Sequence, residues 1–182
     1  MTNTSLYTVK AILFFDSDGK QVISKYYRRD PENSKQFATA TEQKAFEARL
    51  SNKIANNPEE ILLFEGSLVL FQKAGDLTFC LVGKHDENEI LLSSILEGFI
   101  ESLEILLRQN VDKRSVLDAL DIVLLALDET IDDGVVLETD AEIIASRVSK
   151  RSDTADMNLT MLKDQTLLEA YKQAKEKFSL LR

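Results

Sequence analysis

The segment Asp16-Ser17-Asp18-Gly19 holds the first acidic residues whose spacing could bind a metal ion. An EF-hand calcium loop places oxygen ligands at alternate positions over twelve residues, with glycine sixth and glutamate twelfth. Counted from Asp16, the glycine here is fourth and the twelfth residue is Tyr27. Aspartate and glycine are also the residues that tight turns favour. The segment therefore predicts a hairpin turn, and no metal site.

Histidine and cysteine, the other residues that commonly do chemistry, each occur once, as His85 and Cys80. A zinc site or a Ser-His-Asp triad needs more partners than these, and one cysteine forms no internal disulfide. None of the six glycines belongs to a phosphate-binding GxxxxGK or GxGxxG motif. We therefore expect a protein that is not an enzyme and that has no catalytic residues, metal or cofactor. His85 is interpreted as a loop residue and Cys80 as a buried strand residue.

An acidic group stands out at the predicted end of a helix: Asp128, Glu129, Asp132 and Asp133. The helix macrodipole is already negative at that end, so basic residues would be favoured there. Two interpretations stay open, namely solvated surface charge and a docking site for a basic partner surface.

The first half of the chain predicts β-prone runs around one helix. The strands are expected at Leu6–Phe15, Gln21–Tyr27, Ile61–Phe64, Ser67–Lys73 and Leu77–Val82. Glu65-Gly66 is expected to form a bulge or kink, and "KAGD" a turn. The helix is expected over Thr41–Asn56, because Phe46, Leu50 and Ile54 are spaced four apart.

From Asn88 the apolar period becomes helical, and "RQNVDKR" ends this first helix. A second helix is expected over about Ser115–Asp132, with Gly134 as its left-handed cap. Its predicted apolar stripe is Leu117, Leu120, Leu124, Leu127 and Ile131. A short helix is expected over about Asp140–Lys150.

The last part of the chain is predicted to stand outside the main fold. Residues 1–150 are expected to form one domain, and 151–182 a linker followed by an amphipathic helix. The apolar residues of that helix are Leu167, Tyr171, Ala174, Phe178 and Leu181. It is expected to cover a groove on its own domain or on a partner, with a membrane interface as the alternative.

The overall charge bears on the kind of partner. The net charge is −9, from 22 basic and 31 acidic residues. This charge disfavours direct binding to nucleic acid or to an anionic bilayer. The N-terminal sequence lacks the pattern of a secretory signal, so a cytoplasmic location is expected.

Several stretches resemble one family. "LYTVKAILFFDSDGKQVISKYY", "LLFEGSLVLFQKAGDLTFCLVG" and "ENEILLSSILEGFIESLEILLRQNVDKRSVLDALD" are similar to the small subunits of vesicle coats, in particular to zeta chains of the COPI coat. "EQKAFE", "ALDETIDDGVVLETD" and the closing "KEKFSLLR" extend the resemblance from about Ser5 to Arg182. It implies an α+β, longin-like fold (β-β-α-β-β-β-α-α) with a five-stranded antiparallel sheet flanked by helices, plus the C-terminal amphipathic helix.

The resemblance also implies a role. A zeta-type subunit would bind the solenoid trunk of the coatomer gamma subunit within the F-subcomplex of the whole coat. The small GTPase Arf would recruit that assembly to the cytosolic side of the Golgi membrane for transport to the endoplasmic reticulum and within the Golgi. The alternative is a longin-domain trafficking regulator or tethering factor that acts on a small GTPase. Longin SNAREs continue into a coiled coil and an anchor, whereas this sequence ends at Arg182.

The related sigma subunits of clathrin adaptors bind dileucine sorting signals in a surface pocket. The corresponding positions are Leu77, Ile100 and Val111, with Asn110 beside them. Two further positions that are apolar in sigma chains are Lys113 and Ser115 here. A lysine that faced a leucine ligand would have to lose its hydration or turn away. The resemblance thus implies a partner or cargo surface that differs from the sigma pocket.

Overall fold

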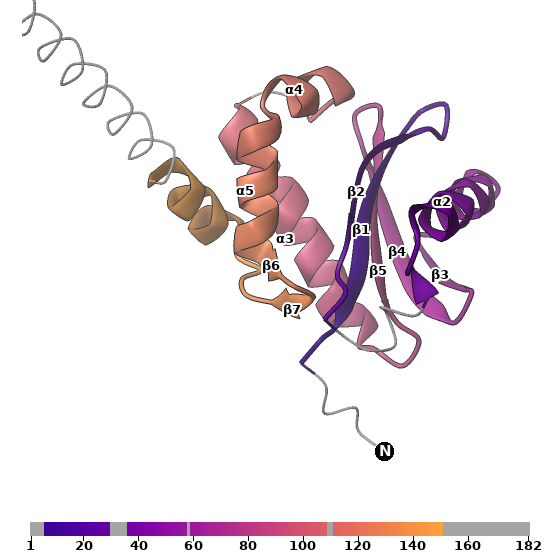
Figure 1. The fold of residues 1–182 in the computed structure, drawn as a ribbon. Coiled ribbons are helices and arrows are strands. Elements are labelled where there is room, and N and C mark those ends of the chain that lie inside the picture. Colours follow the sequence, from indigo (N-terminus) through magenta and orange to yellow (C-terminus); the bar gives the residue numbers. More distant parts are fainter. Residues whose placement is uncertain (1–5, 30–35, 58, 109–110, 151–182) are drawn as a thin grey trace, which may run out of the picture.

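The computed structural model describes residues 6–29, 36–57, 59–108 and 111–150. One antiparallel sheet of five strands stands between helices on its two faces (Figure 1). The strands are β1 (Val9–Asp16), β2 (Gln21–Tyr26), β3 (Ile61–Phe64), β4 (Ser67–Ala74) and β5 (Leu77–Lys84). The helices are α2 (Ala40–Ala55), α3 (Glu89–Leu107), α4 (Lys113–Asp118), α5 (Leu120–Thr130) and a helix over residues 141–150.

The sheet has the strand order β2-β1-β5-β4-β3, so β1 and β5 lie at its centre. All eight residues of β1 are buried. A strand covered on both faces needs apolar residues at nearly every position, which explains why "VKAILFF" alternates only in part. The predicted sheet is confirmed, although β1 begins at Val9 and Leu6 is exposed.

Two hydrophobic cores lie on opposite faces of this sheet. On one face, Phe46, Leu50 and Ile54 of α2 pack against Leu13 and Phe15 of β1. The predicted spacing of that helix is confirmed. Its first turn is closed by a capping box between Thr39 and Glu42, which fixes the helix start one residue earlier than expected.

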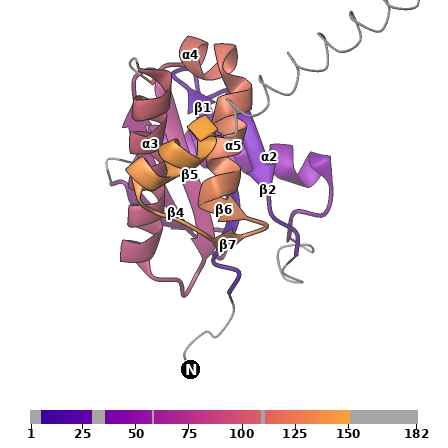
Figure 2. The ribbon, with the colours of Figure 1, turned by 90° about the vertical axis from the view of Figure 1, so that its left-hand side faces the viewer.

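The other core lies between the sheet and the remaining helices. The rings of Phe14, Phe79 and Phe99 form its centre, with centroids 4.5 Å apart for Phe14–Phe79 and 5.9 Å for Phe14–Phe99. Viewed from this side, α3, α5 and the helix over 141–150 lie in front of the sheet (Figure 2). The segment before that last helix crosses α3 at Gly98, where a Cβ atom would stand 1.9 Å from the carbonyl oxygen of Thr139.

The prediction of a bulge or kink at Glu65-Gly66 is wrong. These residues form the two-residue turn of a hairpin, because Phe64 pairs with Ser67 and β3 runs antiparallel to β4. Both turn residues have positive φ, 47° and 71°, as tight hairpins that match the strand twist require.

The single helix expected over Ser115–Asp132 is also wrong. The chain forms α4 and α5 with a break at Ala119, whose φ and ψ of −118° and 38° lie outside the helical region. Three members of the predicted apolar stripe, Leu117, Leu120 and Leu124, are exposed. Its other two members, Leu127 and Ile131, are buried together with Val116, Val123 and Ala126.

Gly134 does not cap a helix. It lies in the turn between two short strands, β6 (Ile131–Asp132) and β7 (Val135–Val136). The carbonyl oxygen of Gly134 accepts hydrogen bonds from the backbone of Thr8 and Val9, at 3.0 and 3.1 Å. A Cβ here would stand 2.7 Å from the oxygen of Val9, so this close approach and the φ of +90° both favour glycine. The tail helix predicted beyond residue 150 lies outside the described residues.

Candidate partner-binding surfaces

The Asp16–Gly19 segment forms the β1–β2 turn. The carboxylate of Asp16 accepts hydrogen bonds from the backbone N–H groups of Asp18 and Lys20, at 3.1 and 2.8 Å. Asp16 therefore shapes the turn by binding the backbone, as aspartate does in Asx turns. Within the described residues, no group of three histidine, cysteine or acidic side chains could hold a metal ion.

A distant residue completes this turn. Nζ of Lys113, at the start of α4, donates to Oδ2 of Asp16 over 2.8 Å, and the carboxylate is almost fully buried. The bond to Lys113 and those to the turn backbone hold the pKa of Asp16 below its ordinary value. The pKa of Lys113 is raised for the same reason. Residues 16 and 113 share no local sequence pattern, so this contact could not be predicted from the sequence.

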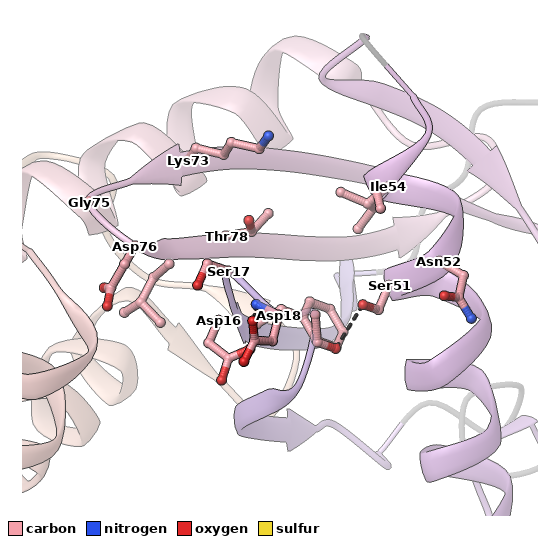
Figure 3. Close-up of a pocket in the computed structure, with 14 residues that line it drawn as sticks. Asp16, Ser17, Asp18, Ser51, Asn52, Ile54, Lys73, Gly75, Asp76 and Thr78 are labelled. Atoms are coloured by element: carbon pink, nitrogen blue, oxygen red, sulfur yellow. Dashed lines mark hydrogen bonds between the residues drawn. The ribbon is translucent and has the colours of Figure 1, made fainter.

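A hollow of about 400 Å³ lies on the α2 side of this turn (Figure 3). The turn forms one wall, the β4–β5 turn another, and the end of α2 a third. Oγ of Ser51 spans it by donating to the carbonyl oxygen of Gly19 at 2.8 Å. Its lining mixes the carboxylates of Asp16, Asp18 and Asp76 with the amine of Lys73. This arrangement offers no nucleophile activated by a base.

The positions taken from the sigma pocket are found in the core. Leu77, Ile100 and Val111 belong to one buried cluster and are each at most 3% exposed. The structure thus brings the three together but presents none of them to solvent. Asn110 lies outside the described residues.

Lys113 turns away from these apolar side chains, toward Asp16. Its backbone N–H also donates to Oδ1 of Asp76 at 2.7 Å, which ties the start of α4 to the β4–β5 turn. At Gly75 in that turn, a Cβ would stand 2.3 Å from the carbonyl oxygen of Val111. The two turns and α4 therefore close over the apolar cluster.

The four acidic residues do not form one helical end. Asp128 and Glu129 lie in α5, Asp132 in β6, and Asp133 in the β6–β7 turn. Asp128 pairs with Lys25, Asp133 with Arg29 at 2.9 Å, and Glu129 is 3.8 Å from Arg147. Among the four, Asp132 is the one without an ion pair to another described residue.

Three leucines of the predicted apolar stripe are exposed on α4 and α5. We call Leu117, Leu120 and Leu124 the leucine stripe; their exposed fractions lie between 38% and 46%. Asp118 and Asp121 flank it. The pattern of spacing is the same for a buried and for an exposed stripe, which is why the sequence did not reveal it.

The two remaining candidate residues, Cys80 and His85, lie where the sequence predicts them, in a strand and in a loop. Cys80 is fully buried at the centre of the sheet, and burial raises the pKa of its thiol. His85 is exposed beside Asp86. No helix in the described ranges has the length and apolar composition that crossing a bilayer demands.

Comparison with known proteins places the chain in a family. Residues 8–155 match the family model described as clathrin adaptor complex small chain. Coatomer subunit zeta-3 of Arabidopsis thaliana is 42% identical over 96% of this chain and 94% of its own length. Coatomer subunit zeta of Saccharomyces cerevisiae and coatomer subunit zeta-1 of Homo sapiens are each 41% identical, over 98% of this chain and 96% of their own length.

The fold agrees with these matches. One chain of a homology model of the full-length AP-3 complex, in a stretched open conformation, superposes with a TM-score of 0.63 and 16% identity. The superposition covers 84% of this chain and 98% of that one. The predicted longin-like small-subunit fold is thereby confirmed. These matches are to structural subunits of coats rather than to enzymes, and they show that the chain belongs to the clathrin adaptor complex small chain family, among the coatomer zeta subunits.

Proposed function

We propose that this chain acts as the zeta-type subunit of a COPI coat by binding the trunk of the coat's gamma subunit. The observation that carries the proposal is identity of 41% to 42% with coatomer zeta chains over nearly their whole length. In this role the chain would act on the cytosolic side of the Golgi membrane, within an assembly recruited by Arf. Its vesicles would move from the Golgi to the endoplasmic reticulum and within the Golgi.

The exposed leucine stripe is evidence for binding to a large helical partner. Its three leucines project from α4 and α5, away from the sheet and from the buried face of both helices. An exposed apolar strip flanked by carboxylates suits a helix that carries both apolar and basic side chains. We assign the trunk of the gamma subunit to this surface.

We propose that the four acidic residues Asp128, Glu129, Asp132 and Asp133 form a second docking patch for the same partner, next to the leucine stripe. Asp132 is free to pair with a basic partner, whereas Asp128, Glu129 and Asp133 would exchange the chain's own basic side chains for the partner's. Charge reversal at Asp132 should then weaken the complex more at low salt than at high salt, because exposed ion pairs are screened.

Co-expression with a gamma-subunit trunk, followed by size-exclusion chromatography, tests the proposal. The wild-type chain should co-elute with the trunk, and a Leu120→Asp, Leu124→Asp double variant should separate from it. Leu63→Lys, which changes an exposed leucine on β3, serves as the matched control and should co-elute. A wild-type chain that runs apart from the trunk would refute the proposed function. A double variant that still co-elutes would refute only the assigned surface.

The buried cluster of Leu77, Ile100 and Val111 stays a candidate cargo site only in a form in which Lys113 has left Asp16. We propose that Lys113→Ala increases binding of a dileucine peptide to the assembled subcomplex. Equal binding of the peptide by wild type and variant, measured by fluorescence anisotropy, would refute the proposed cargo site.

A further inference from the structure

Strand β3 is an edge of the sheet, and no other described strand pairs with its outer side. The turn that joins β3 to β4 is closed by the pair Phe64–Ser67, and Phe71 N–H donates to the carbonyl oxygen of Glu60 at 2.8 Å. In an antiparallel pair, alternate residues direct their backbone groups to the neighbour. Glu60, Leu62 and Phe64 therefore face β4, and the N–H and C=O groups of Ile61 and Leu63 point to the free edge.

The same two residues carry exposed apolar side chains. Leu63 is 70% exposed and Ile61 38% exposed. Two hollows of about 440 and 430 Å³ adjoin the strand and share Glu59 and Ile61 in their walls. The buried side chains of Leu68, Leu70 and Leu96 form their apolar floor.

The rim of these hollows is acidic. Their linings include the carboxylates of Glu59, Glu60, Glu89 and Glu97 against the single amine of Lys53. None of the four glutamates forms an ion pair with another described residue. A ligand with positive charge beside its apolar groups would complement this rim.

The two edges of the sheet differ in how they are protected. Natural sheets guard free edges with charged side chains, especially lysine, because open edges pair with other chains. The opposite edge strand, β2, carries Lys25, which pairs with Asp128 of α5. β3 carries Ile-Leu-Leu-Phe and no charge.

From these observations we propose that the β3 edge binds an extended segment of another protein, which adds a sixth strand to the sheet. The segment would place apolar side chains over Ile61, Leu63 and the hollows. The side chains between them would point to the opposite face of the sheet, so lysine or arginine there would be attracted to the acidic rim through the net charge of the segment at low salt, rather than by direct pairing with Glu89 and Glu97 of α3. This is a second interaction surface, beyond the proposed binding of the gamma subunit. The apolar residues of the chain's own segment 167–181 follow a helical spacing rather than the alternation that a strand on this edge requires.

The probe is a capped ten-residue peptide of alternating lysine and valine, titrated into the full chain at low salt. Binding should protect the amides of Ile61 and Leu63 from hydrogen exchange, as followed by NMR. The same peptide N-methylated at every second residue keeps its charge but cannot bond along one edge. We expect it to bind about tenfold more weakly, the effect of losing one or two net hydrogen bonds.

Two variants complete the test. Leu63→Lys should weaken the unmodified peptide about tenfold, through lost apolar contact and charge repulsion. Leu117→Lys changes an equally apolar exposed residue on α4 and should leave binding unchanged. Equal affinity for both peptides, or unchanged binding by Leu63→Lys, would overturn the proposal. Protection of Ile61 and Leu63 in the peptide-free chain would also overturn it, since the edge would then already be covered by the chain itself.

Discussion

Asp16 and Lys113 are separated by 97 positions and meet in one ion pair. Asp16 serves two structures at once, since it shapes the β1–β2 turn and holds the start of α4. Lys113 thereby ties the start of α4 to the β1–β2 turn. At the residue scale, this pair joins a turn of the sheet to the helix that lies over the buried cluster of Leu77, Ile100 and Val111.

Replacing Asp16 by asparagine should lower the free energy of unfolding near neutral pH, because Asn keeps the turn bonds but loses the charge pairing. Folding lowers the pKa of Asp16, so its contribution is complete above the ordinary value of 3.8 and is lost as pH falls toward the folded value. The gap between wild type and Asp16→Asn in thermal unfolding should thus shrink on acidification from pH 7 to pH 3.

Asp18→Asn is the control for this measurement. Asp18 is exposed and pairs only loosely with Lys20, at 3.7 Å. Its substitution should produce no comparable gap at neutral pH. An Asp16→Asn gap that stayed constant over the whole pH range would contradict the role of the ion pair.

At the scale of elements, two close backbone approaches help to position the segments that follow α3. The segment that leads to the helix over 141–150 crosses α3 where Gly98 leaves room for the oxygen of Thr139. The β6–β7 hairpin is joined to the start of β1 by the hydrogen bonds that the backbone N–H groups of Thr8 and Val9 donate to the carbonyl oxygen of Gly134. These crossings position the helix over residues 141–150, whose Ile144 and Val148 pack into the core on the α3 side of the sheet.

Gly98→Ala should destabilise the protein, because the new methyl group meets a backbone oxygen that cannot rotate away. Overpacking of this kind costs about 1–3 kcal/mol, measurable by urea denaturation. Ser94→Ala, on the exposed side of the same helix, should stay within about 0.5 kcal/mol of wild type. A Gly98→Ala protein as stable as wild type would show that the crossing is loosely packed.

At the scale of the whole molecule, one sheet separates two cores. Ile54 belongs to the core under α2, and Ile95 to the core under α3 and α5. The two side chains share no contact cluster, yet both cores pack on the same central strands. The leucine stripe lies on the helices that cover one face of the sheet, and β3 forms one of its edges.

Ile54→Val and Ile95→Val should each lower the free energy of unfolding by about 0.5–1.5 kcal/mol. Because the sites lie on opposite faces of the sheet, the double variant should equal the sum within about 0.5 kcal/mol, in a single unfolding transition. Chemical denaturation followed by circular dichroism gives all three values. Two separate transitions would mean that the cores unfold independently.

The sequence alone determined the strands within a few residues, the buried face of α2 and the existence of α3, because alternation and helical spacing are local properties of a chain. It also carried the family resemblance in its motifs. It misplaced the Glu65-Gly66 turn, the break at Ala119 and the role of Gly134, where local patterns fit two structures equally well.

Only the tertiary structure decided which apolar stripe is buried and which charges are paired. Leu117, Leu120 and Leu124 have the spacing of a core helix, yet the core they would join is already filled by Val116, Val123 and Leu127. Asp16 finds Lys113, and Asp128 finds Lys25, only after distant elements pack together. Burial and charge pairing depend on neighbours brought in from elsewhere in the chain, so a pattern read along one segment does not contain them.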